Sequence, residues 1–266
     1  MPKDDVQNAS NEIISLCLEV AETSIDNLDR LEMLYSKLDP ILDVADRETV
    51  ELVLSHPTFQ ENRDQLHTKR AHYEYDREKL LADEIITEHN ADVAEKFRSH
   101  DWYDKALDFE TTALAPYKLQ NILFVGSGPF PTSPMAFLRN NPNAKVSCME
   151  RYEAACEKAR QVANIFGMDA LNIINEESTD VSDFTPYDCV IVGLVVGAVQ
   201  EQKAKIVKHF LDHVPEETLL CFRTADGSGQ IIYPSVDLDH LAGLNYKVLE
   251  GPPHKSFTLV IVERGQ

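Results

Sequence analysis

A glycine-rich loop follows an apolar run in the second half of the chain. The loop reads FVGSGP and contains Gly126, Ser127, Gly128 and Pro129. Glycines at this spacing permit a tight turn and let a ligand approach the backbone closely. The third glycine of a dinucleotide-binding loop is missing and further prolines follow. This weakens the case for NAD, whose pyrophosphate needs an open helix N-terminus. The loop by itself is also compatible with a plain tight turn.

Polar or small residues follow the next apolar runs at positions where a nucleotide would lie. The run KVSCME ends at Glu150, roughly 20–25 residues after the loop, where an acid can accept ribose hydroxyls. NIIN leads into Glu176 and Glu177, one of which would lie beside an adenine ring. GLVVGA, beginning at Gly193, would line the bottom of the cleft. Together these positions favour S-adenosylmethionine (SAM) over NAD, although each acid could instead be a solvated surface residue.

The elements that must position these residues form an α/β pattern. From Gln120 onward, short runs rich in Val, Ile and Leu alternate with helical stretches. Buried runs of this length indicate strands of a mostly parallel sheet, and the alternation predicts βαβ units. We therefore expect a Rossmann-like domain of the SAM-dependent methyltransferase type over residues 118–266. The last two runs, YKVLE and FTLVIVE, can pair as an antiparallel edge.

The first half has a different period. Residues 1–117 contain no glycine, and apolar residues between Ile14 and Leu31 recur at steps of three and four over one continuous helical stretch. Further helices are expected at about 46–54, at 58–98 with a break near Asn90, and at 102–114. These residues predict an all-helical N-terminal domain whose boundary lies between Pro116 and Gln120.

Composition limits the classes of function. The chain has 266 residues and a net charge of −20, which disfavours nucleic acid and anionic membranes as partners. No apolar run is long enough for a membrane helix and the first residues are polar, so a cytoplasmic protein is expected. The five scattered cysteines and nine scattered histidines form no metal-binding spacing. We therefore predict no metal site.

Four segments give the sequence a resemblance to the nicotianamine synthase family, including its bacterial members that make opine-type metallophores. They are FVGSGPFPTS, CMERYEAA, FRTADG with IIYP, and the helical segment DWYDKALDFE. The resemblance covers most of the chain from about Ala71 onward. It implies transfer of the 3-amino-3-carboxypropyl group of SAM onto an amino-acid amine, with release of methylthioadenosine. Histidine is the acceptor that the bacterial members suggest, and a separate opine dehydrogenase would act on the product. A homodimer is possible.

The resemblance also assigns catalytic residues. The attacking amine must be neutral, so a carboxylate should take its proton. In the family this carboxylate is a glutamate of the long N-terminal helix, and Glu74 is the best match here. Glu78, one turn further along the same face, is the alternative. A family tyrosine that shapes the site corresponds to Tyr103. Core packing for Tyr103 and simple solvation for Glu74 are the competing interpretations.

Three further residues suit the ends of the transferred group and the acceptor. Arg223 follows the run LLCF at a strand end and could pair with a carboxylate, although a structural ion pair is the alternative. Asp226 could hold an ammonium group or orient the acceptor. Tyr233 lies beyond a turn containing Gly227 and Gly229 and would also face the substrate.

Two other functions remain open from the sequence. A small-molecule methyltransferase would share the SAM site and release S-adenosylhomocysteine instead of methylthioadenosine. A non-catalytic SAM-binding protein would bind SAM without turnover. The identity and stereochemistry of the acceptor, the number of transfer cycles and the oligomeric state are not predicted by the residues.

Overall fold

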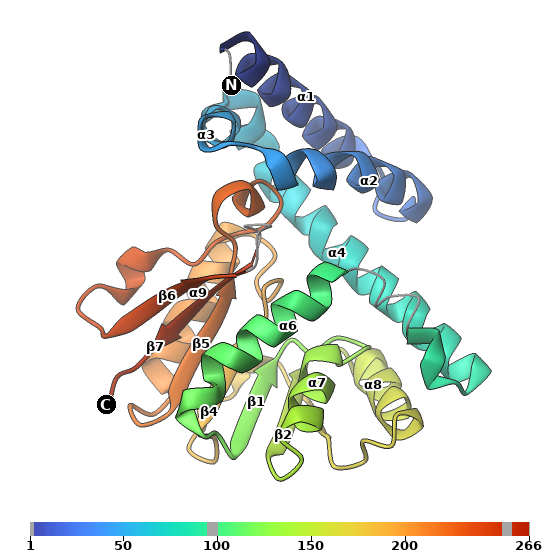
Figure 1. Ribbon diagram of the computed structural model, residues 1–266, viewed down its shortest axis with the longest axis vertical. Helices are drawn as coiled ribbons and strands as arrows, with labels where there is room; N and C mark the ends of the chain where they lie inside the picture. The colour runs from blue at the N-terminus through green and yellow to red at the C-terminus, as the bar shows by residue number, and fades with distance from the viewer. Residues whose placement is uncertain (1–2, 95–100, 252–256, 266) are drawn as a thin grey trace.

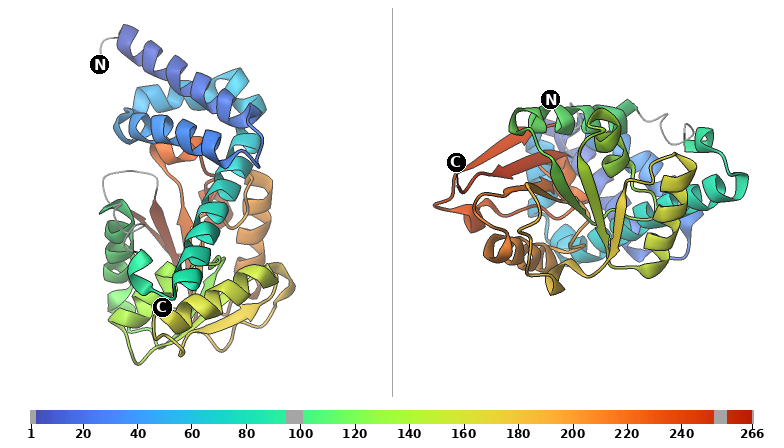
Figure 2. Two further views of the ribbon diagram at one scale, coloured as in Figure 1. Left: turned by 90° about the vertical axis from the view of Figure 1, so that its right-hand side faces the viewer. Right: turned by 90° about the horizontal axis from the view of Figure 1, so that it is seen from below.

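The structure is a computed structural model that describes residues 3–94, 101–251 and 257–265. Helices α1 (Lys3–Glu22), α2 (Leu28–Val44) and α3 (Arg47–Ser55) form a layer at one end of the molecule (Figure 1). The long helix α4 (Pro57–Glu88) leaves this layer and runs along the side of the α/β part, as the left view of Figure 2 shows. The short helix η1 (Ala91–Ala94) follows it, and α6 (Asp101–Leu114) with η2 (Ala115–Tyr117) leads into the sheet.

Seven strands form a single sheet in the order β3-β2-β1-β4-β5-β7-β6. The strands are β1 (Asn121–Val125), β2 (Lys145–Glu150), β3 (Asn172–Asn175), β4 (Cys189–Val192), β5 (Leu219–Thr224), β6 (Tyr246–Glu250) and β7 (Thr258–Val262). The first five are parallel, and β7 is antiparallel to both β5 and β6. The predicted α/β sheet preceded by helices is confirmed. The predicted pairing of the last two strands is also confirmed, but β7 lies inside the sheet and β6 forms its edge.

Side-chain packing explains why the sheet strands are apolar throughout. One face packs in a cluster with α7 (Thr132–Asn140), α8 (Glu153–Ile165), α6 and the C-terminal part of α4. The other face packs in a cluster with α9 (Gln200–His213) and η5 (Leu238–Leu241). A sheet buried on both faces needs continuous apolar runs rather than alternation, as the sequence of β1 and β4 shows.

Helix boundaries in the N-terminal half follow from capping residues. The stretch around Ile14 to Leu31 was expected to be one helix, but α1 ends at Glu22 and Asn27 caps α2 by accepting from the Arg30 amide at 3.2 Å. Periodicity continues across this break because both helices bury their apolar faces in the same core. Asp46 caps α3 in the same way, and His89 ends α4 in the left-handed conformation with φ of 47°.

Buried clusters do not follow the predicted boundary near residue 117. Phe59, Leu66 and Tyr73 of α4 pack with α1 to α3, and this cluster also takes in Ile231 and Tyr233 from the far end of the chain. The C-terminal part of α4, from Leu81 onward, packs instead in the cluster below the sheet. Helix α4 therefore belongs to both cores. Within the described residues, no helix is long and apolar enough to cross a membrane.

Candidate active site

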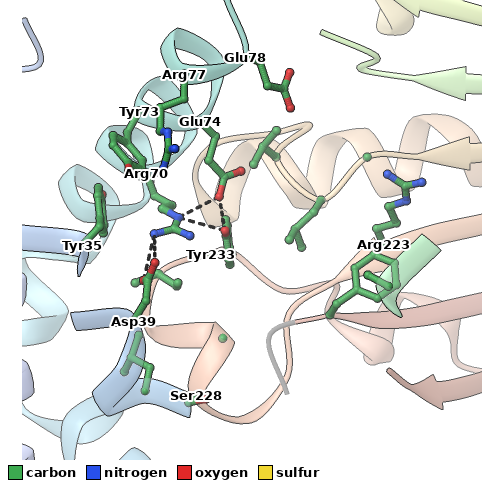
Figure 3. A pocket seen from close by; sticks show the side chains of 18 of the residues that line it. Tyr35, Asp39, Arg70, Tyr73, Glu74, Arg77, Glu78, Arg223, Ser228 and Tyr233 are labelled. Atoms are coloured by element: carbon green, nitrogen blue, oxygen red, sulfur yellow. Dashed lines mark hydrogen bonds and ion pairs between the residues drawn. The ribbon is translucent and has the colours of Figure 1, made fainter. Parts of the chain in front are cut away.

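A cavity of about 610 Å³ opens between the two cores, at the carboxyl ends of the parallel strands. Loops after β1, β4 and β5 form one wall, called here the sheet wall. Helices α2 and α4 form the opposite wall, called the helix wall, and the 3-10 helix η4 (Gly227–Ile231) closes one side. Figure 3 shows the side chains of both walls pointing into the same space. Five predicted site residues line it: Gly126, Gly193, Glu74, Arg223 and Tyr233.

The glycine-rich loop turns sharply between β1 and α7. Gly126 and Gly128 both have positive φ, of 77° and 65°. A Cβ atom at Gly126 would lie 2.2 Å from a methyl carbon of Val196, and one at Gly128 would lie 2.4 Å from a carboxylate oxygen of Glu78. Both positions therefore require glycine for space as well as for conformation. Gly193 is similarly crowded, since a Cβ there would lie 3.0 Å from the Val125 carbonyl oxygen.

The other predicted residues of this loop face inward. Ser127 lies between the glycines with its hydroxyl buried beside Cys148. Pro129 is buried, and Pro131 precedes the first residue of α7. These residues hold the loop's shape rather than line the cavity.

Glu150 lies at the end of β2 and is 8% exposed. One carboxylate oxygen accepts from the Gly128 amide at 3.2 Å, and the other accepts from the Tyr152 amide at 3.0 Å. A carboxylate offers about four acceptor positions, so two backbone bonds leave capacity for a pair of hydroxyl groups. Glu150 is not among the residues that line the cavity, and its contact with a ribose stays a prediction.

The two candidates after β3 differ in their surroundings. Glu176 is exposed, whereas Glu177 is half-buried and pairs with Arg151 at 3.5 Å. Ser178 also donates to Glu177 at 3.3 Å. Both acids lie along a separate open hollow beside β3 rather than along the main cavity. Of the two, Glu177 has the fixed side chain.

Four residues from three segments form an ionic network on the helix wall, called here the Arg70 network. Arg70 pairs with both oxygens of Asp39, at 3.0 and 3.1 Å, and its Nε donates to Glu74 at 2.8 Å. The Tyr233 hydroxyl donates to the same Glu74 oxygen and accepts from Arg70 at 3.0 Å (Figure 3). Burial beside Glu74 raises the pKa of Tyr233 well above its usual range, so the phenol keeps its proton.

Glu78 differs from Glu74 although both extend from α4 into the cavity. Burial, reinforced by the negative charges of Glu74 and Glu150, raises the pKa of Glu78 well above its usual range, while Arg223 opposes the shift. The Glu78 carboxylate lies against the backbone of Gly128, whereas the Glu74 carboxylate is held by the Arg70 network. Glu78 is thus an acid of α4 that lies against the glycine-rich loop and holds its proton more tightly than an ordinary carboxyl group.

A second polar cluster lies beside the Arg70 network. The Tyr73 hydroxyl donates to Glu32 at 2.5 Å and accepts from Arg77 at 3.0 Å. Arg77 also pairs with Glu32 at 3.3 Å. Because Arg77 and Glu32 are partly exposed, this cluster offers a cation and an anion that a ligand can compete for.

Arg223 projects from the end of β5 and pairs with Glu110 of α6 through two bonds, at 2.7 and 2.6 Å. Glu110 is 3% exposed, so this is a buried ion pair. Loss of either partner from such a pair costs about 3–5 kcal/mol of stability because the other charge stays buried. The guanidinium also lies 5.8 Å from the ring centres of Phe124 and Phe257. The structural ion pair is therefore present, and Arg223 also lines the cavity, but its pairing with a substrate carboxylate stays a prediction.

The last two predicted residues, Asp226 and Tyr103, are not among those that line the cavity either. The Asp226 side chain is exposed and accepts from the Gly227 amide at 2.7 Å, so it caps η4 and does not line the cavity. The predicted contact of Asp226 with an ammonium group gains no support from this position. Tyr103 belongs to α6, but its side chain lies outside the described residues and its role stays a prediction.

Sequence reasoning missed the polar faces of α2 and α4. The missed residues that line the cavity are Glu32, Tyr35, Asp39, Arg70, Tyr73 and Arg77. On each helix they recur at steps of three and four, which is the spacing of one helix face. The signal was the combination of charged residues with tyrosines on such a face, which a search for apolar periodicity does not detect. Among the described residues, no group of three or more His, Cys, Asp or Glu could hold a metal ion.

The family model described as nicotianamine synthase protein matches residues 3–266. The chain belongs to the nicotianamine synthase family. Two similar relatives are nicotianamine synthase 1 of Hordeum vulgare and nicotianamine synthase 2 of Oryza sativa subsp. japonica. The barley protein is 31% identical over 153 residues, which are 54% of this chain and 45% of the relative. The rice protein is 29% identical over 150 residues, which are 54% of this chain and 46% of that relative. The chain thus matches about half the length of these curated relatives.

Solved structures confirm the fold over nearly the whole chain. A glutamate-to-glutamine mutant of MtNAS in complex with S-adenosylmethionine superposes with a TM-score of 0.78 at 20% identity, covering 96% of this chain and 97% of that one. MtNAS in complex with MTA and tNA superposes with a TM-score of 0.76 at 20% identity, covering 99% of this chain and 98% of that one. Both the helical layer and the sheet of this family member are therefore shared with solved structures.

Proposed function

We propose that this protein transfers the 3-amino-3-carboxypropyl group of SAM to the amine of an amino acid. The observation that carries the proposal is the cavity itself. It sets acids of α4 opposite the glycine-rich loop, which suits a bound adenosyl group and which Glu150 supports from behind through the Gly128 amide. Family membership supports the same reaction, as does the MtNAS structure that contains S-adenosylmethionine.

The reaction is a displacement at carbon. The amine nitrogen forms a bond to the carbon of the aminocarboxypropyl arm that is attached to sulfur. The carbon–sulfur bond breaks, its electron pair stays on sulfur, and methylthioadenosine leaves as a neutral thioether. One proton must leave the new ammonium group, and a carboxylate near neutral pKa can take it.

We infer that Glu78, rather than the predicted Glu74, accepts this proton. One Glu74 oxygen is already engaged, because it accepts from Arg70 at 2.8 Å and from the Tyr233 hydroxyl. The pKa of Glu78 is raised by burial and by neighbouring acids. A bound sulfonium would counter that rise, and loss of the sulfonium charge during transfer would restore it. Glu78 therefore becomes a stronger base as the reaction proceeds.

The charge of the cavity favours a basic acceptor. Its described lining holds five carboxylates but three guanidinium groups: Glu32, Asp39, Asp43, Glu74 and Glu78 against Arg70, Arg77 and Arg223. SAM carries one net positive charge, which leaves excess negative charge for a second cation. Histidine, which the family resemblance suggests, can bear such a charge on its imidazole. The product would be a precursor of an opine-type metallophore, completed by a separate dehydrogenase.

Product analysis tests the proposal. The protein is incubated with SAM and a mixture of amino acids, and mass spectrometry identifies the nucleoside product. Methylthioadenosine together with an aminocarboxypropyl adduct of histidine is the expected result. S-adenosylhomocysteine would instead establish the runner-up, a small-molecule methyltransferase with the helix wall as a substrate lid. SAM binding without turnover over a broad panel of amines would contradict both enzymes.

A further inference from the structure

Lys203 is a buried amine beneath the sheet wall. It belongs to the first turn of α9 and is 1% exposed. Its ammonium donates to the Leu194 carbonyl at 2.7 Å, with a longer contact of 3.5 Å to the Gly193 carbonyl. Among the ion pairs between described residues, none includes Lys203. Burial lowers the pKa of this amine to about 7. Burying a lysine side chain costs free energy, so we look for its role in the backbone carbonyl groups that it contacts.

The segment that Lys203 contacts connects β4 to α9 over residues 193–199. Gly193, Leu194 and Val195 line the cavity. Val196 turns the other way, where its methyl carbon fills the space beside Gly126 and Gly193. The segment therefore contacts the glycine-rich loop directly, and any shift of it would move both sides of the sheet wall.

Three contacts fix this segment to α9 from beneath. Lys203 binds its first carbonyls, and Gln202 accepts from the Ala198 amide at 3.1 Å. Gly197, with φ of 81°, packs so closely that a Cβ there would lie 2.8 Å from the Lys203 amide nitrogen. Because Lys203 lies under the segment and does not line the cavity, the Leu194 carbonyl that it binds points away from the ligand space.

We propose that Lys203 is a positioning residue that holds segment 193–199 in the shape the cofactor requires. It acts by drawing the Leu194 carbonyl inward, so that Leu194 and Val195 face the cavity and Val196 supports the glycine-rich loop. The inference rests on the proposed function in taking SAM as the ligand of the sheet wall. It adds a residue that never touches the ligand but controls how well the ligand binds.

Calorimetric SAM titration of folded variants tests the inference. Lys203→Met keeps the length of the side chain and removes the ammonium, so SAM affinity should fall about tenfold, the equivalent of one charge-assisted hydrogen bond. Lys203→Gln keeps a hydrogen-bond donor group, so its SAM affinity should lie between those of Lys203→Met and the wild type. The KM for the acceptor should stay unchanged in both variants, a split that a merely structural lesion would not produce. Lys205→Met, on the exposed side of the same helix, is the matched control and should bind like wild type.

Two outcomes would overturn the inference. One is a folded Lys203→Met variant with wild-type SAM affinity. The other is unchanged hydrogen exchange of residues 193–199 in free Lys203→Met or, if that variant does not fold, in Lys203→Gln, since the expected result is faster exchange there. If wild type itself fails to bind SAM, the proposed function fails, and the exchange measurement still decides the role of Lys203.

Discussion

The two walls of the cavity present different kinds of atoms. The sheet wall offers bare backbone at Gly126 and Gly193, and the buried carboxylate of Glu150 supports the loop through the Gly128 amide. The helix wall offers side chains, joined in the Arg70 network and in the Tyr73 cluster. Backbone at strand ends is fixed by the sheet, whereas ionic side chains can exchange partners with a ligand. We therefore expect the sheet wall to set SAM affinity and the helix wall to set acceptor binding and proton transfer.

The largest expected effect separates the two acids of α4. Glu78→Gln should lower kcat about 10²–10⁴-fold, because that is the usual contribution of a general base, with SAM affinity changed by less than fivefold. Stopped assays of methylthioadenosine with parallel SAM titrations measure both quantities. Glu74→Gln is the matched control and should cost about tenfold or less. The reverse order, with Glu74→Gln the inactive variant, would return the base role to Glu74.

A methyl group on the glycine-rich loop should affect SAM alone. Gly126→Ala places a Cβ 2.2 Å from a methyl carbon of Val196 at a positive φ, so we expect SAM affinity to fall at least about tenfold while the KM for the acceptor holds. Gly167→Ala is the control, since Gly167 has φ of 66° and nothing within 4 Å of an added Cβ. Equal SAM affinity in the two variants would contradict the fit of the loop to the cofactor.

The opposite pattern is expected from the helix wall. Arg70→Lys keeps the charge but loses the paired bonds to Asp39 and the Nε bond to Glu74. The KM for the acceptor should rise about tenfold with SAM affinity unchanged, as steady-state kinetics with each substrate varied would measure. Arg47→Lys alters an exposed helix pair and should have no effect. A rise in the SAM dissociation constant instead would contradict the expectation that the helix wall sets acceptor binding and the sheet wall sets SAM affinity.

The smallest effect concerns stability rather than catalysis. His67 is 2% exposed, and burial lowers its pKa from 6.5 to about 4. The unfolded state therefore binds a proton at His67 more readily than the folded state does. The resulting contribution to the free energy of unfolding is present in full above pH 6.5 and falls by up to about 3 kcal/mol as the pH drops toward 4. Thermal melts from pH 7.5 to 4.5 should show a steeper loss in wild type than in His67→Gln. Parallel curves would show that the buried imidazole does not control this range.

The sheet wall could be predicted from sequence because its signals are local. Loop residues Gly126 and Gly128 and the acid Glu150 each follow an apolar run, and parallel strands bring their carboxyl ends to one edge. The helix wall depends on which faces of α2 and α4 meet across the chain, and no local pattern states this. Asp39 and Arg70 are 31 residues apart, and Glu110 lies 113 residues from Arg223. Family resemblance supplied Glu74, but the choice between Glu74 and Glu78 required the contacts of Arg70 and Gly128.

Helix α4 has a consequence for any attempt to divide the chain. It is one unbroken rod of 32 residues, about 48 Å long, with its first part in the helical core and its last part in the core under the sheet. The acids that face the cavity occupy the stretch between these two anchors. A fragment that starts at residue 118 would lose the cover of one sheet face, and we expect it to aggregate rather than to bind nucleoside. The unit that an engineer could transplant is therefore the rod together with both of the cores that hold its ends.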